Sequence, residues 1–245
     1  MALDCSAVIR DEGERALDAL AADADGTVSW CGDWRVRDVV AHIGSGHHMT
    51  AQIVAGRPTT DMSVRATLAP PEDDGLLAEW VGAGTTGLLD QLAASDPDDE
   101  CWSWYPDDQT VGFWARRMAH ETLVHRWDAE RGAGVAPEPM DPELASDGID
   151  EMLEVFVGLT RVLFEAPGEG ESAHLHCTDT DGEWLITFPA PSERVVTREH
   201  AKGDVAFRGS AEALLLFLWG RDGGAVDTVG DRAVADHWRE LVPPM

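Results

Sequence analysis

Apolar residues recur at helical spacing in four long segments of the first half of the chain. These segments cover roughly residues 4–23, 34–56, 76–94 and 113–128. Each segment has one long apolar face, which is typical of amphipathic helices that bury a single side. Asp33 directly precedes the second segment and is a suitable N-cap for it. We therefore predict a four-helix bundle in this half of the chain.

The pattern changes after residues 133–142, a stretch that contains three prolines and marks a domain boundary. Short runs rich in β-branched and aromatic residues follow, separated by polar turns: AHLHCTD, WLITFP, ERVVTRE and DVAFRG. Such runs predict an antiparallel sheet. Helices are expected over residues 141–165, 210–219 and 233–241. The predicted fold class is therefore α+β, with a helical bundle over residues 1–138 and a smaller α+β domain over residues 139–245.

The composition narrows the range of partners. The chain has 18 Lys and Arg against 46 Asp and Glu, a formal net charge of -28. A surface this acidic disfavours nucleic acid and anionic membranes, because both bind basic footprints. No stretch of 18 apolar residues and no signal-peptide pattern is present, so we expect a cytoplasmic protein. The four cysteines form no C-x-x-C pair, which argues against a disulfide framework. We also expect the protein to be a monomer.

Glu121 and His125 carry the first candidate chemistry. They are four residues apart and therefore lie on one face of the predicted helix, with Asp128 one turn further on the same side. A carboxylate and an imidazole placed in this way can supply two metal ligands, and a second carboxylate can orient the histidine. A solvated pair of surface side chains is the alternative. His120 and His125 are five apart, so the zinc-protease motif His-Glu-x-x-His is absent.

A third ligand must come from another helix, and His42 is the best candidate. It lies in the middle of the apolar stretch of the second segment. With Glu121 and His125 it would complete a set of two histidines and one glutamate with open coordination positions. A core histidine with an ordinary hydrogen bond is the alternative. His47 is about 140° around the helix from His42, so we expect it at the helix surface or a pocket rim, and it serves as a reserve ligand.

Three motifs carry a resemblance to a known family. They are GDWRVRDVVAHI near residue 38, MAHETLVHRWDAE near residue 123 and LLLFLWGR near residue 218. Together they resemble the maleylpyruvate isomerase family of mycothiol-dependent enzymes, which belongs to the DinB-like metal-binding four-helix bundles. The resemblance implies a metal triad of His42, Glu121 and His125. It also implies a sterol-carrier-like C-terminal domain.

The resemblance further implies roles for two other residues and a reaction class. Asp128 matches the aspartate that follows the family's last histidine, and Arg221 matches its late arginine. The implied function is metal-dependent transfer of mycothiol to a small electrophile, or isomerisation of one, with zinc as the first choice of metal. A metal-dependent hydrolase and a non-catalytic binding protein are the alternatives.

Two further features have plain structural interpretations. His174 and His176 alternate with Leu175 in one predicted strand, so we expect both on the face away from the core, exposed to solvent, rather than in a second metal site. Arg221 follows a predicted helix, where a cation interacts favourably with the C-terminal end of the helix dipole. Binding of an anionic group by Arg221 is the alternative that the resemblance favours.

Overall fold

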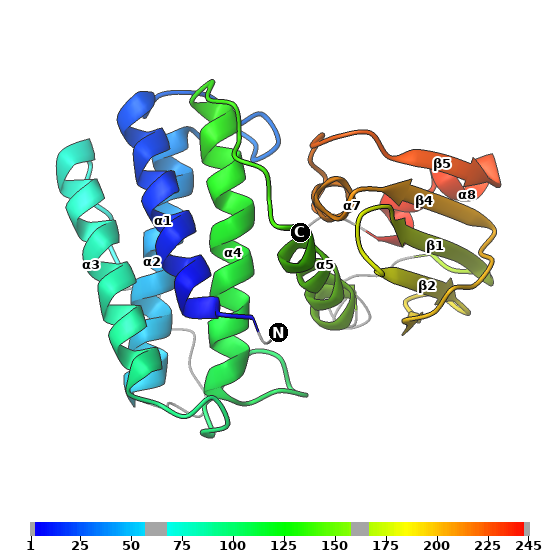
Figure 1. The fold of residues 1–245 in the computed structure, drawn as a ribbon, viewed down its shortest axis with the longest axis horizontal. Coiled ribbons are helices and arrows are strands. Elements are labelled where there is room, and N and C mark those ends of the chain that lie inside the picture. Colours follow the sequence, from blue (N-terminus) through cyan, green and yellow to red (C-terminus); the bar gives the residue numbers. More distant parts are fainter. Residues whose placement is uncertain (1–2, 57–67, 158–166, 243–245) are drawn as a thin grey trace. The chain divides into compact units, whose positions relative to one another are not determined.

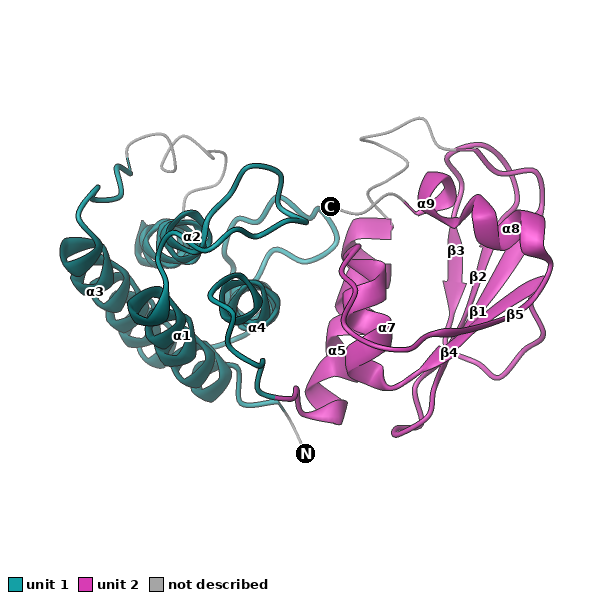
Figure 2. Cartoon of the chain, turned by 90° about the horizontal axis from the view of Figure 1, so that it is seen from above, with its two compact units in different colours: residues 1–138 teal, residues 139–245 magenta. Residues whose placement is uncertain are grey.

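The computed structural model describes residues 3–56, 68–157 and 167–242 of the chain. The chain divides into two compact units, residues 1–138 and 139–245. The first unit is made of helices, and the second combines helices with a sheet (Figure 1 and Figure 2). This arrangement confirms the predicted α+β fold class.

The described residues of the first unit form a bundle of four long helices (Figure 1). They are α1 (Cys5–Ala22), α2 (Val36–Gly56), α3 (Asp74–Ala93) and α4 (Val111–Gly132). Both α1 and α2 pack against α3 and against α4. The side chains of Asp4, Asp73 and Thr110 each accept a backbone N–H in the first turn of α1, α3 and α4. These caps satisfy donors that a helix start leaves unpaired, and they account for the positions at which the three helices begin.

The core between α1, α2 and α3 is built from the apolar positions that recur at helical spacing. Its buried side chains include Leu20, Val36, Val40, Ile43 and Val81. Because one face of each helix supplies them, the periodicity of the sequence located all four helices to within a few residues. Within the described parts of the chain, no helix has the length and apolarity needed to cross a membrane.

The start of α2 differs from the prediction, because Asp33 does not cap it. Asp33 is exposed and lies in a turn beside Gly32, whose φ is 67°. An isolated bridge between Thr27 and Arg35 holds the chain extended just before the helix. The carboxylate of Asp38 then accepts the backbone N–H of Arg35 at 2.9 Å. The bridge delays the helix to Val36, and the first N–H groups of α2, those of Val36 and Arg37, donate to the backbone carbonyls of Gly26 and Ala24 instead of to Asp33.

Helix α4 is buried around most of its circumference, and several of its polar side chains are enclosed. Arg126 is fully buried and donates to the carboxylates of Glu12 on α1 and Glu130 on α4. A buried guanidinium requires such partners, since an unpaired charge in the interior is very costly. Arg126 is thus held by specific contacts within the bundle.

The second unit begins with helix α5 (Pro142–Glu151), which continues into a π-helical turn, η2 (Met152–Val157). The sequence predicted one helix over residues 141–165, and its last part, residues 158–166, lies outside the described residues. Helix α7 (Ala211–Leu218) packs against α5, and two short helices, α8 (Arg232–Asp236) and α9 (Trp238–Leu241), follow. Figure 2 shows α5 and α7 on the same side of the sheet.

Among the described residues of this unit, five strands form one sheet in the order β3-β2-β1-β4-β5. Their bounds are Glu171–Cys177 for β1, Glu183–Phe188 for β2, Val195–Thr197 for β3, Val205–Gly209 for β4 and Asp227–Gly230 for β5. The expectation of an antiparallel sheet is wrong for one pair, because β1 and β4 run parallel. The chain reaches this arrangement because β1, β2 and β3 form a meander, after which β4 returns to the free edge of β1.

Alternate residues of the central strands form the core of this unit. Leu175, Ile186 and Phe207 are buried on the face toward the helices, where Trp238 packs against Phe207. The residues between them point to the opposite face. His174, His176 and Glu183 are on that opposite face, with His176 directly across from Glu183 in the β1–β2 pair.

Candidate metal centre

His42 on α2 meets Glu121 and His125 on α4, as the sequence predicted. The Nε2 atom of His42 lies 2.8 Å from Glu121 Oε1, and His125 Nε2 lies 3.5 Å from the same oxygen. The two imidazole rings meet edge to face with their centroids 4.9 Å apart. One potential ligand atom from each of the three residues lies within 4.8 Å of the other two. The packing of α2 against α4 therefore brings two imidazoles and one carboxylate close together.

Arg117 fixes the orientation of Glu121. Its Nη2 atom donates to Glu121 Oε2 at 3.1 Å, so the other carboxylate oxygen, Oε1, faces the two histidines. The Arg117 side chain is only 3% exposed. Arg117 is not among the residues predicted from the sequence, although its position four residues before Glu121 places it on the same helix face. That spacing is the signal that could have found it.

Asp128 lies behind His125. Its fully buried carboxylate accepts a hydrogen bond from His125 Nδ1 at 2.9 Å and another from Trp30 Nε1. The thiol of Cys31 is 3.8 Å from the same carboxylate. A carboxylate bonded to Nδ1 keeps a proton on that nitrogen, so Nε2 of His125 is the atom presented to Glu121. Trp30 could not be predicted as a partner, because it lies 98 residues away along the chain.

The charges of this cluster are strongly coupled. Burial alone would raise the pKa of Glu121, but the charge of His125 and hydrogen bonds from both histidines hold it well below its usual value. Burial alone would lower the pKa of His125, yet Glu121 and Asp128 raise it to about 9. In the metal-free protein, His125 is therefore a cation near neutral pH. Any metal that takes Nε2 of His125 must displace a proton.

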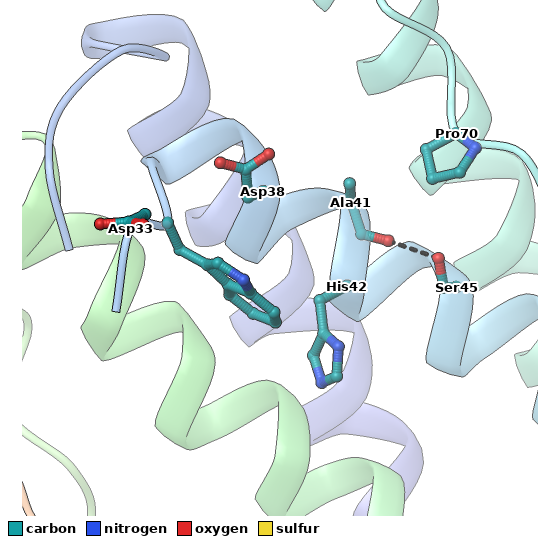
Figure 3. A pocket seen from close by; sticks show the side chains of 7 residues that line it. Asp33, Asp38, Ala41, His42, Ser45 and Pro70 are labelled. Carbon is teal, nitrogen blue, oxygen red and sulfur yellow. Dashed lines mark hydrogen bonds between the residues drawn. The ribbon is translucent and has the colours of Figure 1, made fainter. Parts of the chain in front are cut away.

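A pocket of about 380 Å³ opens beside His42 (Figure 3). Its lining residues are Asp33, Trp34, Asp38, Ala41, His42, Ser45 and Pro70. The indole of Trp34 lies 5.2 Å from the His42 ring, centroid to centroid. The side chains of His42 and Glu121 are 20% and 21% exposed, whereas that of His125 is 10% exposed. Small molecules can therefore approach the cluster from the His42 side.

A second hollow of about 650 Å³ adjoins this pocket and shares Asp38, Ala41 and Pro70 with it. It brings in two cations, Arg35 and Arg37. Both guanidinium groups also contact acidic residues, with Arg35 near Asp25 and Arg37 near Asp74. The space next to His42 therefore combines apolar surface with charged groups of both signs.

His47 is not at the helix surface or a pocket rim, contrary to prediction. It is 1% exposed, and its two ring nitrogens lie 2.9 Å from Thr85 Oγ1 and 2.8 Å from Thr122 Oγ1. Burial lowers its pKa to about 4, so it is neutral at neutral pH. The error arose because the inner face of α2 is wider than a single row of residues. Both nitrogens are held by threonines, so His47 is a structural side chain of the bundle core.

Arg221 belongs to the second unit. It is 8% exposed, and its Nη1 atom donates to the carbonyl of Trp219, the C-cap residue of α7, at 2.5 Å. Gly220 between them has a φ of 78°, the left-handed conformation in which helices often end. This contact agrees with the interpretation of Arg221 as a cation at a helix C-terminus.

Comparison with known protein families gives two matches. The model of the mycothiol maleylpyruvate isomerase N-terminal domain matches residues 7–130, and the model of the MDMPI C-terminal domain matches residues 143–237. No curated protein and no solved structure gives a significant match. The two matched regions cover most of the chain and follow one another in the order of the family, which confirms the resemblance seen in the three sequence motifs. The chain belongs to the mycothiol maleylpyruvate isomerase family.

Proposed function

We propose that this protein is a metal-dependent enzyme that acts on a small electrophilic substrate. It would either transfer mycothiol to that substrate or use mycothiol to isomerise it. The observation that carries the proposal is the convergence of His42, Glu121 and His125 beside an open pocket. Membership of the mycothiol maleylpyruvate isomerase family supports the choice of thiol and reaction class. Fold alone would not support it, because one fold hosts many chemistries.

The three side chains fit a divalent metal, with zinc as the first choice. Zinc-to-ligand bonds of about 2.0–2.1 Å in a tetrahedron place ligand atoms about 3.3 Å apart. The observed separations of 2.8 Å for His42 and 3.5 Å for His125 from Glu121 Oε1 bracket that value. Two imidazoles and one carboxylate also suit nickel, iron or copper, so the donor set alone leaves the metal open.

The chain's own residues would prepare this site before substrate arrives. Arg117 holds Glu121 with one oxygen toward the histidines, and Asp128 holds His125 with Nε2 forward. Three protein ligands leave at least one coordination position open, as in catalytic rather than structural sites. A bound divalent cation would supply stabilisation of the thiolate form of a thiol near neutral pH.

The proposed isomerisation needs no redox partner. The thiol sulfur adds to one carbon of a maleyl double bond, and a proton adds to the other carbon. The remaining single bond rotates, and loss of the same sulfur and a proton restores the double bond in the trans form. The pocket beside His42 would hold the substrate during this exchange. We include in the proposal that Arg221 binds an anionic group, which rests on the family resemblance alone.

The first test is the metal content of the purified protein, measured by mass spectrometry beside a His125→Ala variant prepared in the same way. We expect the variant to lose about one metal ion per chain and all thiol-dependent turnover. A His237→Ala variant is the control, because this histidine is exposed and lies in the other unit.

Two results would contradict the proposal. One is equal metal content in the wild-type protein and the His125→Ala variant. The other is metal-loaded protein that neither binds mycothiol nor reacts with maleylpyruvate or other electrophiles in its presence. Turnover that requires metal but no thiol would replace the proposal with a hydrolase, since metal-bound water would then be the nucleophile.

A further inference from the structure

We propose that the second unit contains a structural zinc site formed by His174, His176, Glu183 and His200. One potential ligand atom from each residue lies within 4.8 Å of the other three. The Glu183 carboxylate is at the centre: Oε1 lies 2.8 Å from His176 Nδ1, and Oε2 lies 3.3 Å from His174 Nε2. The same Oε2 lies 2.5 Å from His200 Nδ1. This proposal does not depend on the function proposed for the first unit.

The sheet brings these residues together. His174 and His176 are two apart on β1, so their side chains point to the same face. Glu183 begins β2 and pairs directly with His176, which places the two side chains next to each other on that face. His200 follows the short edge strand β3, and its ring reaches those of His174 and His176 with centroid separations of 5.6 Å and 6.3 Å. Two strands and one connecting segment thus contribute to one cluster.

The burial of the His174 ring supports a metal ion at this position. We expected solvent-exposed histidines on this face, and that expectation is wrong for His174, which is 7% exposed. Its Nε2 atom is buried and lies 3.3 Å from Glu183 Oε2, but this contact lacks the geometry of a hydrogen bond, and no other hydrogen-bond partner is found among the described residues. A buried nitrogen without a partner costs free energy, so such atoms in native proteins call for an explanation. Nε2 of His174 faces Glu183, where a metal ion would satisfy it.

The donor set indicates the class of metal. Three imidazoles and one carboxylate suit zinc, which prefers four nitrogen, sulfur or oxygen ligands in a tetrahedron. Tetrahedral ligand atoms would be about 3.3 Å apart, close to the contacts of 2.5 to 3.3 Å around Glu183. The widest separation, up to 4.8 Å, requires some adjustment. Movement of the His200 side chain, which is 81% exposed, would not disturb the core.

The nearby charges permit a cation. One carboxylate and three neutral imidazoles around a divalent ion leave a local charge of about +1. Arg208 is a cation near the site, because it lies directly opposite His176 in the β1–β4 strand pair. Its side chain is exposed and can turn toward solvent. The excess of acidic over basic residues in the whole chain also favours cation binding.

Four protein ligands fill a tetrahedral zinc, so this site would have a structural rather than a catalytic role. Its effect would fall on the segment that carries His200, between β3 and β4. The metal would fasten that segment to the face of the sheet opposite the helices. We therefore expect zinc to slow amide hydrogen exchange in residues 198–204.

The test uses the full chain in a His125→Ala background, which removes the candidate centre of the first unit. Zinc affinity is measured by competition with a chromophoric chelator, before and after the further change His200→Asn. We expect one bound zinc ion in the background variant. We expect its affinity to fall by more than the 10- to 100-fold that loss of an outer partner costs, since His200 is a direct ligand. His237→Asn is the matched control, because this histidine is exposed in the same unit but lies outside the cluster.

Cobalt substitution and hydrogen exchange provide independent measurements. We expect Co²⁺ to give the intense visible absorption of a tetrahedral complex in the background variant, and Glu183→Gln to abolish it. We expect zinc to slow exchange in residues 198–204 only when His200 is present. The proposal is overturned if the background variant binds no zinc, if His200→Asn leaves affinity unchanged, or if His237→Asn weakens binding equally.

Discussion

The two histidine clusters differ in what surrounds their ligands. In the first unit, Asp128 orients His125 and Arg117 orients Glu121, and both supporting residues are on α4 with the candidate ligands they hold. In the second unit, one carboxylate, Glu183, contacts three histidines, and one of these, His200, is almost fully exposed. In the first cluster, Glu121 and His125 are held by residues of their own helix, whereas the second cluster depends on the segment with His200, which only a bound metal would fix.

This difference separates two uses of the same side chains. A cluster of three ligands on rigid helices, next to a pocket, suits chemistry because its geometry is set before any substrate binds. A cluster of four ligands on a sheet and a connecting segment suits a structural role. Four protein side chains complete the coordination of the metal and leave no position open to a substrate.

The largest effect is expected from Glu121→Gln. This change preserves the shape of the side chain but removes the charge that the two histidines share. We expect metal affinity at the first cluster and thiol-dependent turnover to fall by more than about 100-fold, beyond the loss of an outer partner. The measurement is metal competition together with single-substrate kinetics. Glu79→Gln, an exposed change on α3, is the control, and an unchanged affinity for Glu121→Gln would remove Glu121 from the ligand set.

A smaller effect is expected from Asp128→Asn. The amide can no longer hold His125 by its charge, so we expect metal affinity at the first cluster to fall by about 10- to 100-fold. Binding at the second cluster should not change. Both can be followed by zinc competition, with His200→Asn used to silence the second cluster. Asp90→Asn on the surface of α3 is the matched control. Equal losses at both clusters would indicate a global effect on folding.

The metal affinity of the first cluster should depend on pH. Because the pKa of His125 is raised to about 9, a proton must leave before the metal can bind. We expect the affinity of a His200→Asn variant to rise about tenfold per pH unit from pH 7 until it levels near pH 9. Calorimetry in buffers of different ionisation enthalpy should show about one proton released per metal bound. A flat profile would show that His125 is already neutral in the metal-free protein.

The smallest effect is expected in the stability of the metal-free protein. The folded-state pKa of His125, about 9, is above its ordinary 6.5, so its stabilisation is complete below pH 6.5 and is lost as pH rises through 9. His47 acts in the opposite direction. Its folded-state pKa of about 4 is below 6.5, so its contribution is present above pH 6.5 and is lost as pH falls toward 4.

These two histidines together predict a melting temperature with a maximum near pH 6.5. Thermal unfolding of chelator-treated protein, followed by circular dichroism across this range, measures it. The variant His125→Gln should lose the decline on the alkaline side and keep the acidic one. A decline on the alkaline side that persists in this variant would have another origin.

The helices of the first unit and the motif on α4 could be predicted because both depend on local spacing. Glu121 and His125 share a face whatever the tertiary structure is, and the apolar period marks the bundle helices. Strand β5 was missed because its four residues are all exposed, so no alternation marks it. The parallel pairing of β1 with β4 was missed because strand order is not contained in any local pattern.

The surroundings of the candidate ligands were harder to predict than the ligands. Trp30 reaches Asp128 from a loop far away in sequence, and only the packed bundle brings them together. The alternation of residues correctly placed His174 on the face away from the core, but it could not show that the His174 side chain is buried on that face. His200 lies in an irregular segment without any period. Spacing gives the direction of a side chain, whereas its environment depends on contacts between distant segments.

The contact between His42 and Glu121 also matters for how the chain folds. It joins residues 79 positions apart, whereas His176 and Glu183 belong to adjacent strands of one hairpin. The entropy lost on closing a loop grows with the logarithm of its length, and contacts of high sequence separation form late in folding. We therefore expect a metal at the first cluster to act as a long-range link that mainly slows unfolding of the bundle. A metal at the second cluster would close shorter loops, the longest running from His174 to His200, and would change the folding rate of the sheet less.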